Sequence, residues 1–170
     1  MGRLIRSSAW YTDCGCICPY KYTGQTFPAN PFPGWMKQWA TNIEQLLDMK
    51  KWKINGINFN LYDDFSQFLN FHKDDEKLFK YIDNSTFIVS ISFGASRQFS
   101  IKREFQNDDT ATLHTLNHGD ILTMQGQMQT FWQHAIVKGN HTMSPEPRVN
   151  ATLRVVHRHT ETKCPCNSTN

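Results

Sequence analysis

Several features are scarce or missing in this chain of 170 residues, and each absence excludes a class of protein. No apolar run approaches the roughly 18 residues of a membrane-spanning helix, so we expect no membrane contact. The segment from Met1 to Tyr11 lacks the apolar stretch of a secretory signal. We therefore expect an intracellular protein, cytoplasmic or nuclear, and not a secreted one.

The chain also lacks a strong excess of charge of one sign, and its hydrophobic content is not low. The net charge of +3 is only a weak indication of a polyanionic partner. A hydrophobic content of 39% and an aromatic content of 13% argue against a disordered chain. Because internal repeats and long linkers are absent, we expect one packed domain over residues 1–170.

The cysteines are too few and odd in number for a disulfide framework. They form two clusters, which are Cys14, Cys16 and Cys18 near the start and Cys164 and Cys166 near the end. Without a secretory signal, this pattern predicts reduced thiols. His157 and His159 precede the second cluster, so a zinc site in this tail is one interpretation. The alternative is an exposed and flexible tail, because the spacing matches no standard zinc finger.

Short β-type runs dominate the hydrophobic pattern. They are Gly56–Tyr62, Thr86–Phe93, Arg97–Lys102, Asp120–Met124 and Val149–Val156. Before them, Tyr20 to Gly34 is rich in Pro, Gly and Asn and is typical of a surface loop. A helical apolar stripe follows, made of Trp35, Met36, Trp39, Ile43, Leu46 and Leu47, and we expect both tryptophans to pack in the core. The pattern predicts a mainly β fold with flanking helices and a double-stranded β-helix (jelly-roll) core.

A first chemical signal is the pair His72 and Asp74. On an extended segment, residues i and i+2 point to the same side, so this imidazole and this carboxylate converge. A second imidazole would complete a 2-His-1-carboxylate triad, which binds Fe(II) and leaves open positions. The candidates for this third ligand are His114, His118, His134, His141, His157 and His159. We expect His118 to have a structural role in a turn, and His141 and the tail pair to be solvated.

A second signal is the run from Arg148 to Arg154. Alternation places Arg148, Asn150, Thr152 and Arg154 on one face of a strand. Arginines inside a small sandwich are costly unless they meet an anion, and a dicarboxylate matches the guanidinium geometry. Asn60 and Tyr62 share the same i, i+2 spacing and are further candidate donors to that anion. The alternative is an edge strand with a solvated basic face.

In order and spacing, Asn60-x-Tyr62, His72-x-Asp74, His134 and Arg148-x-Asn150-x-x-x-Arg154 resemble the AlkB family, closest to its animal DNA- and RNA-repair branch. The resemblance implies that His72, Asp74 and His134 bind Fe(II). It also implies that Arg148 binds the 2-oxoglutarate carboxylate far from the metal. Asn60, Tyr62, Asn150 and Arg154 would be the remaining contacts, and O2 the second co-substrate. The implied activity is oxidative demethylation of N-alkylated bases such as 1-methyladenine and 3-methylcytosine, with release of formaldehyde, succinate and CO2.

The resemblance also implies substrate contacts for Arg6, Trp10, Tyr20, Tyr22, Asp75 and Glu76. Tyr22 matches an aromatic residue that stacks on the extruded base, and the two carboxylates match an acidic pair at the base edge. For the aromatic residues, packing in the core or in a loop is the alternative. We expect a substrate-recognition segment at about 1–33, a catalytic core at about 34–157 and a Cys/His tail at 158–170.

The sequence departs from the family at two points. The N-terminal cysteines enlarge the loop between Trp10 and Tyr20, and no strand-separating segment precedes the match. We therefore expect a monomer that favours single-stranded methylated nucleic acid, or a domain of a longer protein. Two other hypotheses stay open, which are the same chemistry on a protein or small molecule and a catalytically silent nucleic-acid-binding or zinc-binding module. The choice between DNA and RNA also stays open.

Overall fold

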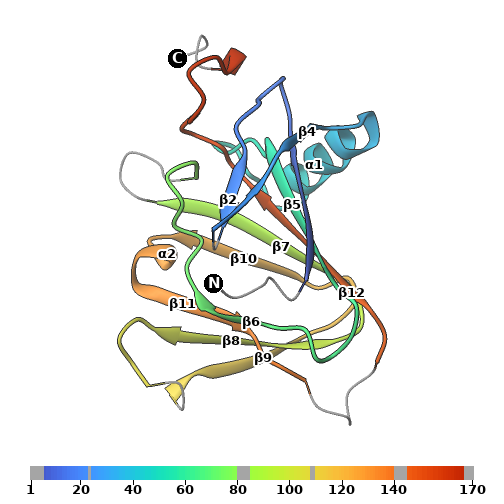
Figure 1. Ribbon diagram of the computed structural model, residues 1–170, viewed down its shortest axis with the longest axis vertical. Coiled ribbons are helices and arrows are strands. Elements are labelled where there is room, and N and C mark those ends of the chain that lie inside the picture. The colour runs from blue at the N-terminus through green and yellow to red at the C-terminus, as the bar shows by residue number, and fades with distance from the viewer. Residues whose placement is uncertain (1–5, 23, 80–84, 108–109, 140–144, 167–170) are drawn as a thin grey trace.

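The computed structural model describes residues 6–22, 24–79, 85–107, 110–139 and 145–166. Its largest element is a six-stranded sheet (Figure 1), whose strands in spatial order are β10 (Ile121–Gly126), β7 (Thr86–Gly94), β12 (Arg148–Arg154), β5 (Gly56–Tyr62), β1 (Ser7–Thr12) and β4 (Ala29–Pro31). Neighbouring strands are antiparallel except for β1 and β4, which run parallel.

A four-stranded sheet lies opposite, in the order β6 (Leu69–His72), β11 (Trp132–Ile136), β8 (Arg97–Arg103) and β9 (Thr112–Leu116). A separate hairpin is formed by β2 (Tyr20–Tyr22) and β3 (Gln25–Phe27), and the short helix α2 (Met128–Phe131) precedes β11. Apolar side chains of both sheets pack together between them, including Ile88, Met124 and Phe99. These two facing sheets confirm the expected mainly β, jelly-roll class of fold.

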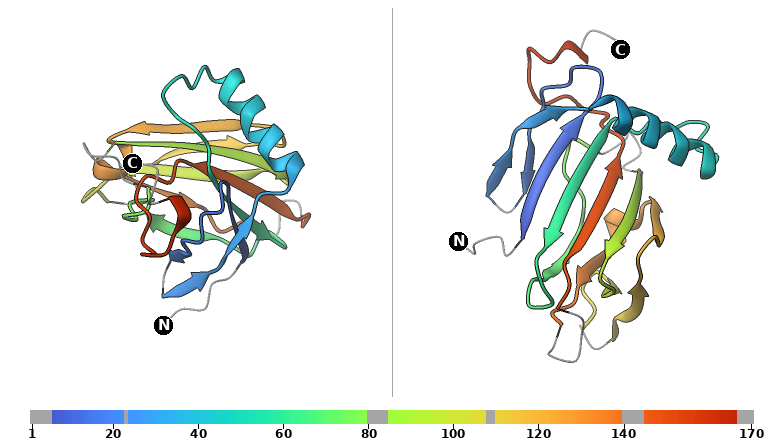
Figure 2. Two further views of the ribbon diagram at one scale, coloured as in Figure 1. Left: turned by 90° about the horizontal axis from the view of Figure 1, so that it is seen from above. Right: turned by 90° about the vertical axis from the view of Figure 1, so that its right-hand side faces the viewer.

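Helix α1 (Gly34–Leu46) covers the outer face of the large sheet, as both views in Figure 2 show. Its residues Met36, Ala40 and Ile43 are buried against Ala151 and Leu153 of β12. Because side chains alternate along a strand, the polar residues of β12 then point to the other face, between the sheets. The predicted helix and the alternation of this strand are therefore present in the structure.

Two sequence expectations about this region are wrong. Trp35 is 62% exposed, because it lies in the first turn of α1 on the side away from the sheet, whereas Trp39 is half-buried with its ring 6.3 Å from that of Phe59. The expected loop from Tyr20 to Gly34 contains three short strands. The hydrophobic pattern of the sequence does not reveal these strands, because each is only three residues long and depends on pairing with a neighbour.

The expected boundary at residue 33, between the substrate-recognition segment and the catalytic core, does not coincide with a boundary between sheets. Both β1 and β4 belong to the large sheet, where β1 pairs along its whole length with β5. The segment expected to recognise substrate is thus built into the same sheet as the core strands. Among the described residues, no helix is long and apolar enough to cross a membrane.

Candidate active site

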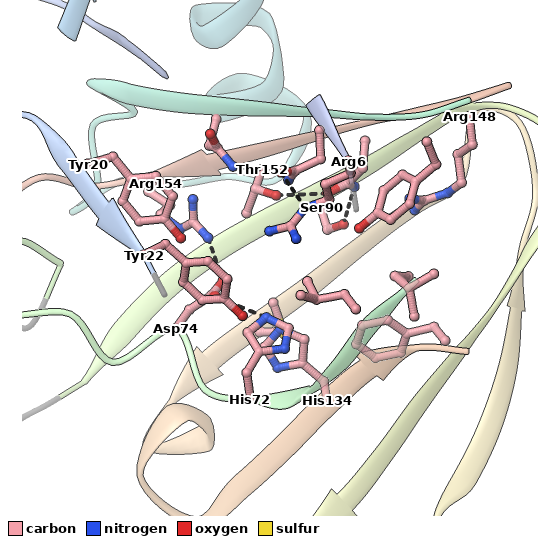
Figure 3. Close-up of a pocket in the computed structure, with 18 residues that line it drawn as sticks. Arg6, Tyr20, Tyr22, His72, Asp74, Ser90, His134, Arg148, Thr152 and Arg154 are labelled. Atoms are coloured by element: carbon pink, nitrogen blue, oxygen red, sulfur yellow. Dashed lines mark hydrogen bonds and ion pairs between the residues drawn. The ribbon is translucent and has the colours of Figure 1, made fainter. Parts of the chain in front are cut away.

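The pairing of β6 with β11 brings the predicted metal ligands together. His72 and His134 are direct cross-strand partners, and their ring centroids are 4.2 Å apart. Asp74 follows two residues after His72, and its Oδ1 lies 3.5 Å from His72 Nε2. One ligand atom from each of the three residues lies within 4.8 Å of the others. The close-up in Figure 3 shows the three side chains gathered on one side of the pocket.

The other candidate histidines lie elsewhere. His114 is exposed on β9, and His118 sits in a turn where its Nδ1 accepts a hydrogen bond from the Gly94 amide, as expected for a structural residue. His157 packs on Trp52 with ring centroids 5.4 Å apart, and His159 lies among cysteines, so the expectation that both tail histidines are solvated is wrong. His141 falls outside the described residues.

Each ligand is held in the protonation state that coordination requires. Nδ1 of His72 lies 2.9 Å from the Asn70 carbonyl, which can only accept, so Nδ1 carries the proton and Nε2 keeps its lone pair. Burial, reinforced by the neighbouring His72 ring, lowers the pKa of His134 to about 3. The His134 imidazole is therefore neutral near neutral pH, which is the form that binds a metal ion.

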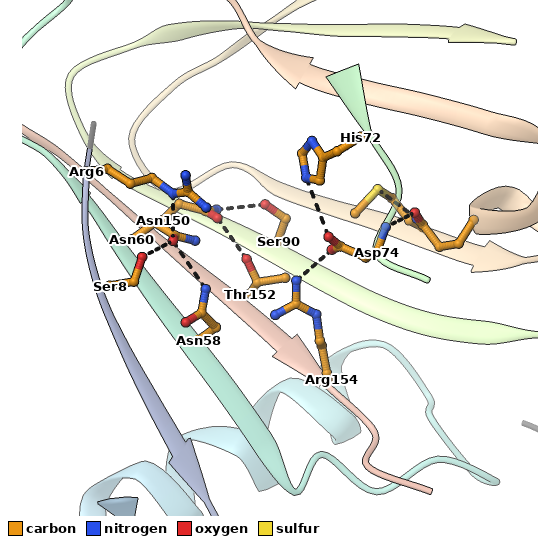
Figure 4. Close-up of polar contacts among 12 residues, drawn as sticks. Arg6, Ser8, Asn58, Asn60, His72, Asp74, Ser90, Asn150, Thr152 and Arg154 are labelled. Carbon is orange, nitrogen blue, oxygen red and sulfur yellow. Dashed lines mark hydrogen bonds and ion pairs between the residues drawn. The ribbon is translucent and has the colours of Figure 1, made fainter. Parts of the chain in front are cut away.

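Asp74 is held in place by one hydrogen bond to its carboxylate and one from its backbone amide. Its Oδ2 accepts a hydrogen bond of 2.6 Å from Arg154 Nη2, and its backbone amide donates to Gln129 Oε1 at 2.8 Å (Figure 4). Burial acts to raise the pKa of Asp74, but the charge of Arg154 and the nearby histidines outweigh it and keep this pKa well below its usual range.

These residues fit a divalent iron ion. Two neutral imidazoles and one carboxylate form the 2-His-1-carboxylate donor set that leaves positions open for other ligands. Among the described residues, the buried Nδ1 of His134 has no hydrogen-bond partner, and Asp74 is 3% exposed. A buried carboxylate that faces two imidazole rings is stabilised by a cation between them.

The wall of the pocket opposite the triad carries an arginine with unused donors. Arg148 is 1% exposed, its Nη2 donates to Ser92 Oγ at 3.0 Å, and its guanidinium carbon lies 5.4 Å from the Tyr62 ring centroid. Its Nε and Nη1 are buried and have no partner among the described residues. A buried guanidinium with unpaired donors fits an anionic guest such as a carboxylate. The two arginines of β12 are thus inside the pocket, and the alternative of a solvated basic edge strand is wrong.

Two of the three asparagines that line the pocket, Asn60 and Asn150, differ in what they can still bind. Oδ1 of Asn60 accepts from Arg6 Nε at 2.9 Å, from Ser8 Oγ at 2.8 Å and from Asn58 Nδ2 at 3.2 Å, which leaves the Asn60 Nδ2 to donate to a guest. Asn150 uses both ends of its amide within the protein. Its Nδ2 donates to Ser90 Oγ at 2.7 Å, and its Oδ1 accepts from Thr152 at 2.9 Å. Asn150 therefore positions its neighbours.

Some residues of this site were missed at the sequence level. Ser90 and Ser92 of β7 receive the donors of Asn150 and Arg148, and Gln129 of α2 holds the Asp74 backbone. The two serines left a weak signal, since they stand at i and i+2 in an otherwise apolar strand. Gln129 could not be recognised from the sequence, because a helix of four residues has no hydrophobic pattern from which a buried glutamine can be predicted.

At the mouth of the pocket, Tyr22 lies beside the triad. Its ring centroid is 5.7 Å from that of His72, edge-on, and the Arg6 guanidinium carbon lies 5.4 Å from its ring. Tyr20 stacks on Tyr22 at 6.1 Å and is buried, with the Arg154 guanidinium 5.2 Å away. Arg6, Tyr20 and Tyr22 all line the same pocket as the triad (Figure 3).

Trp10 is not placed to contact substrate. It is 0% exposed and packs beneath Tyr20, with ring centroids 5.6 Å apart, while its indole N–H donates to the Cys18 carbonyl. The expected substrate contact of Trp10 is therefore corrected to a supporting role, because an aromatic ring enclosed on all sides cannot stack on a base.

The acidic pair is also placed differently from the expectation. Asp75 is exposed, and Glu76 lies against Tyr20 and Leu78 outside the pocket that contains the triad. Burial and the charge of Asp74 raise the pKa of Glu76 to about 7. The pair does not line the pocket that contains the triad, because Asp75 is exposed and Glu76 lines a neighbouring pocket.

The sequence profile of the 2OG-Fe(II) oxygenase superfamily matches residues 3–154, which include the triad and all three pocket arginines. The chain belongs to this superfamily. Its relatives include the alpha-ketoglutarate-dependent dioxygenase alkB homolog 3 of Homo sapiens, which is 32% identical over 159 residues. The DNA oxidative demethylase ALKBH2 of Mus musculus is 28% identical over 163 residues. The expected AlkB relationship, and with it the class of a dioxygenase, is confirmed.

This oxygenase chain spans about half the length of the homolog 3 relatives. The match to the human protein covers 89% of this chain and 52% of that protein, and the match to mouse ALKBH2 covers 89% and 62%. The solved structure of OsALKBH1 superposes with a TM-score of 0.58 at 19% identity, over 78% of this chain and 68% of that chain. That likeness supports the jelly-roll fold.

Proposed function

We propose that this oxygenase is an Fe(II)- and 2-oxoglutarate-dependent demethylase of N-alkylated bases in single-stranded DNA or RNA. The observation that carries the proposal is one pocket that contains the triad, the partly unpaired Arg148 and the aromatic Tyr22. The preferred lesions would be 1-methyladenine and 3-methylcytosine. The names of the relatives alkB homolog 3 and ALKBH2 support this class of reaction.

In this proposal, His72, Asp74 and His134 hold Fe(II), and Arg148 with Asn60 binds 2-oxoglutarate. When bound, iron, O2 and 2-oxoglutarate would supply the oxidising power, and the overall reaction gives succinate, CO2, formaldehyde and the unmethylated base. Arg154 keeps Asp74 ionised through its 2.6 Å hydrogen bond and orients this ligand. Three arginines and one carboxylate line the pocket, so it carries positive charge when the imidazoles are neutral and attracts a dicarboxylate.

Tyr22 and Arg6 form the entrance through which the base would reach the iron. A methyl group on a stacked base cannot approach a buried ion, so the base must be extruded, and single strands reduce that cost. Tyr22 then offers a stacking surface worth about 1–3 kcal/mol. We also propose that the protein works as a monomer, since one copy of the chain supplies the triad, the co-substrate arginine and the stacking tyrosine of the pocket.

The test is an assay on the reconstituted protein. Fe(II) is added without oxygen, followed by air, 2-oxoglutarate and short single strands that carry 1-methyladenine, 3-methylcytosine or N6-methyladenine, as DNA and as RNA. Mass spectrometry should show loss of one methyl group that requires both iron and 2-oxoglutarate, and Asp74→Ala should abolish it. Succinate formation without any demethylation would refute the nucleic-acid substrate while retaining the iron chemistry.

A further inference from the structure

The two cysteine clusters, far apart in the sequence, meet at the end of the molecule opposite the β8–β9 edge. Nδ1 of His159 lies 3.3 Å from Cys16 Sγ, 3.4 Å from Cys164 Sγ and 3.7 Å from Cys18 Sγ. In both Figure 1 and Figure 2, the red C-terminal segment runs beside the blue loop that follows β1. The fold thus gathers these three sulfurs, the sulfur of Cys166 and one imidazole nitrogen, and no role in the active site accounts for them.

Hydrogen bonding does not explain this arrangement. An imidazole nitrogen either donates one proton or accepts through one lone pair, so Nδ1 of His159 can satisfy one thiol and not three. A metal ion does explain it. With zinc bonds of about 2.3 Å to sulfur and 2.0–2.1 Å to nitrogen, the edge of a tetrahedron between the two atom types is about 3.5 Å. The three observed distances lie on either side of that value.

The burial of the donors matches a closed structural site. Cys16 is 6% exposed, Cys18 is 0% exposed and Cys164 is 3% exposed, and all three are free thiols. They belong to an apolar cluster that also contains Trp10 and Val156. Structural zinc sites use four protein donors and no open position, in contrast to catalytic sites.

We propose that Cys16, Cys18, Cys164 and His159 bind one structural zinc ion. The proposal is independent of the demethylase function. It replaces the tail-only ligand set expected from the sequence, because His157 packs on Trp52 instead. Cys166 lies close to Cys16, His159 and Cys164, but its Sγ donates to the Cys14 carbonyl, and it is less buried than Cys18.

The ion would fasten the C-terminal tail to the loop that leads into the pocket entrance. Cys18 lies two residues before Tyr20, and the Cys18 carbonyl accepts the indole N–H of Trp10 at 3.0 Å. On the other side, the backbone amide of His157 donates to the Leu78 carbonyl. Zinc would therefore lock β2, and with it Tyr20 and Tyr22, to the body of the protein.

Cobalt spectroscopy on the reduced wild-type protein tests the proposal without any substitution. Co(II) bound by thiolates gives strong near-ultraviolet charge-transfer absorption, whereas the His72, Asp74 and His134 site contains no sulfur and cannot. We expect this absorption in wild type and in Asp74→Ala alike, with one equivalent of zinc displacing the cobalt. Its absence from the reduced wild-type protein would overturn the proposal.

Variants then identify the ligands. Cys16→Ser should abolish the thiolate absorption and lower the bound zinc by one equivalent, while Cys14→Ser, an exposed thiol in the same loop, should change neither. If Cys166→Ser abolishes the absorption and Cys18→Ser does not, the assignment of Cys18 is wrong. A Cys16–Cys164 disulfide found by peptide mass mapping of protein purified without oxygen would also overturn the site.

Discussion

At the scale of single residues, the pocket is organised by two arginines with different partners. Arg154 donates through Nη2 to Asp74 and lies over the rings of Tyr20 and Phe79, at 5.2 and 4.8 Å. Arg148 donates through Nη2 to the neutral Ser92 hydroxyl. Each arginine keeps a buried Nε and Nη1 without a hydrogen-bond partner among the described residues. Arg154 is thus paired with an anion of the protein itself, whereas Arg148 is free to pair with the anion of a ligand.

Replacing Arg148 should weaken the binding of 2-oxoglutarate. Hydrogen bonds to charged groups contribute about 1.5–3 kcal/mol, so Arg148→Ala should raise the KM for 2-oxoglutarate roughly tenfold to a hundredfold. Succinate formation at varied 2-oxoglutarate measures this. Arg158→Ala, which removes the same charge from an exposed position, is the control and should leave KM unchanged. An unchanged KM in Arg148→Ala would remove that residue from the co-substrate site.

Replacing Arg154 should destabilise the metal-free protein. Breaking a buried ion pair leaves Asp74 uncompensated, and Arg154→Met should lower the free energy of unfolding by about 3–5 kcal/mol. Urea denaturation gives the value. Adding Asp74→Asn to this variant should recover part of the loss, because no charge then remains buried. Equal losses in the single and double variants would show that packing of Arg154, and not its charge, matters.

The ring of Tyr22, and not its hydroxyl, should carry its contribution to substrate binding. Burial raises the pKa of Tyr22 to about 12, so the phenol stays neutral at working pH. Tyr22→Ala should raise the KM for a methylated oligonucleotide about 5- to 150-fold, in line with about 1–3 kcal/mol of stacking, and should spare succinate formation without oligonucleotide. Tyr22→Phe should retain most of the turnover. A similar loss in both variants would contradict stacking.

At the scale of elements, α1 shows how one helix divides its residues between core and solvent. Met36 is 1% exposed against the large sheet, while its neighbour Trp35 is 62% exposed. Met36→Ala should lower the free energy of unfolding by about 2–5 kcal/mol through the cavity it leaves. Trp35→Ala should change it by less than about 0.5 kcal/mol, as is usual for surface sites. Denaturation of both variants checks this, and a large loss at Trp35 would indicate that the tryptophan is covered in solution.

The pairing of strands brings the residues of the site together. β6 supplies His72 and leads into Asp74, while β11 supplies His134 and β12 supplies both arginines. The pairing of β6 with β11 closes one side of the pocket, and the β12 strand in the middle of the opposite sheet closes the other. Each sheet thus contributes part of the chemistry, and the complete site exists only where the two sheets face each other.

At the scale of the whole molecule, ligand binding should stabilise the fold, because the triad bridges elements that are distant in the chain. A ligand present at 100 times its Kd adds about 2.7 kcal/mol to the free energy of unfolding. Mn(II), as a redox-stable substitute for iron, together with 2-oxoglutarate should raise the thermal midpoint of wild type. The same addition should leave Asp74→Ala unchanged, and a rise in that variant would mean that the metal binds elsewhere.

Local patterns in the sequence already determined much of this protein. The i, i+2 spacing of His72 and Asp74 and the alternation from Arg148 to Arg154 depend only on the geometry of an extended chain, so they could be predicted and matched to a family. The five predicted β runs appear as β5, β7, β8, β10 and β12 for the same reason. Short, polar strands such as β2 and β4 could not be predicted, because they exist through pairing and not through their own composition.

Only the tertiary structure decided which distant residues meet. Spacing alone left six histidines open for the third ligand position. The family resemblance implied His134, and the β6–β11 register places it directly opposite His72. The burial of Trp10 beneath Tyr20 and the meeting of Cys16 with Cys164 likewise join segments that share no local pattern. The physical reason is that alternation along a strand fixes the face on which a side chain lies. Contacts between distant segments depend instead on how whole sheets pair and pack, and the spacing of residues in one sequence does not reveal that.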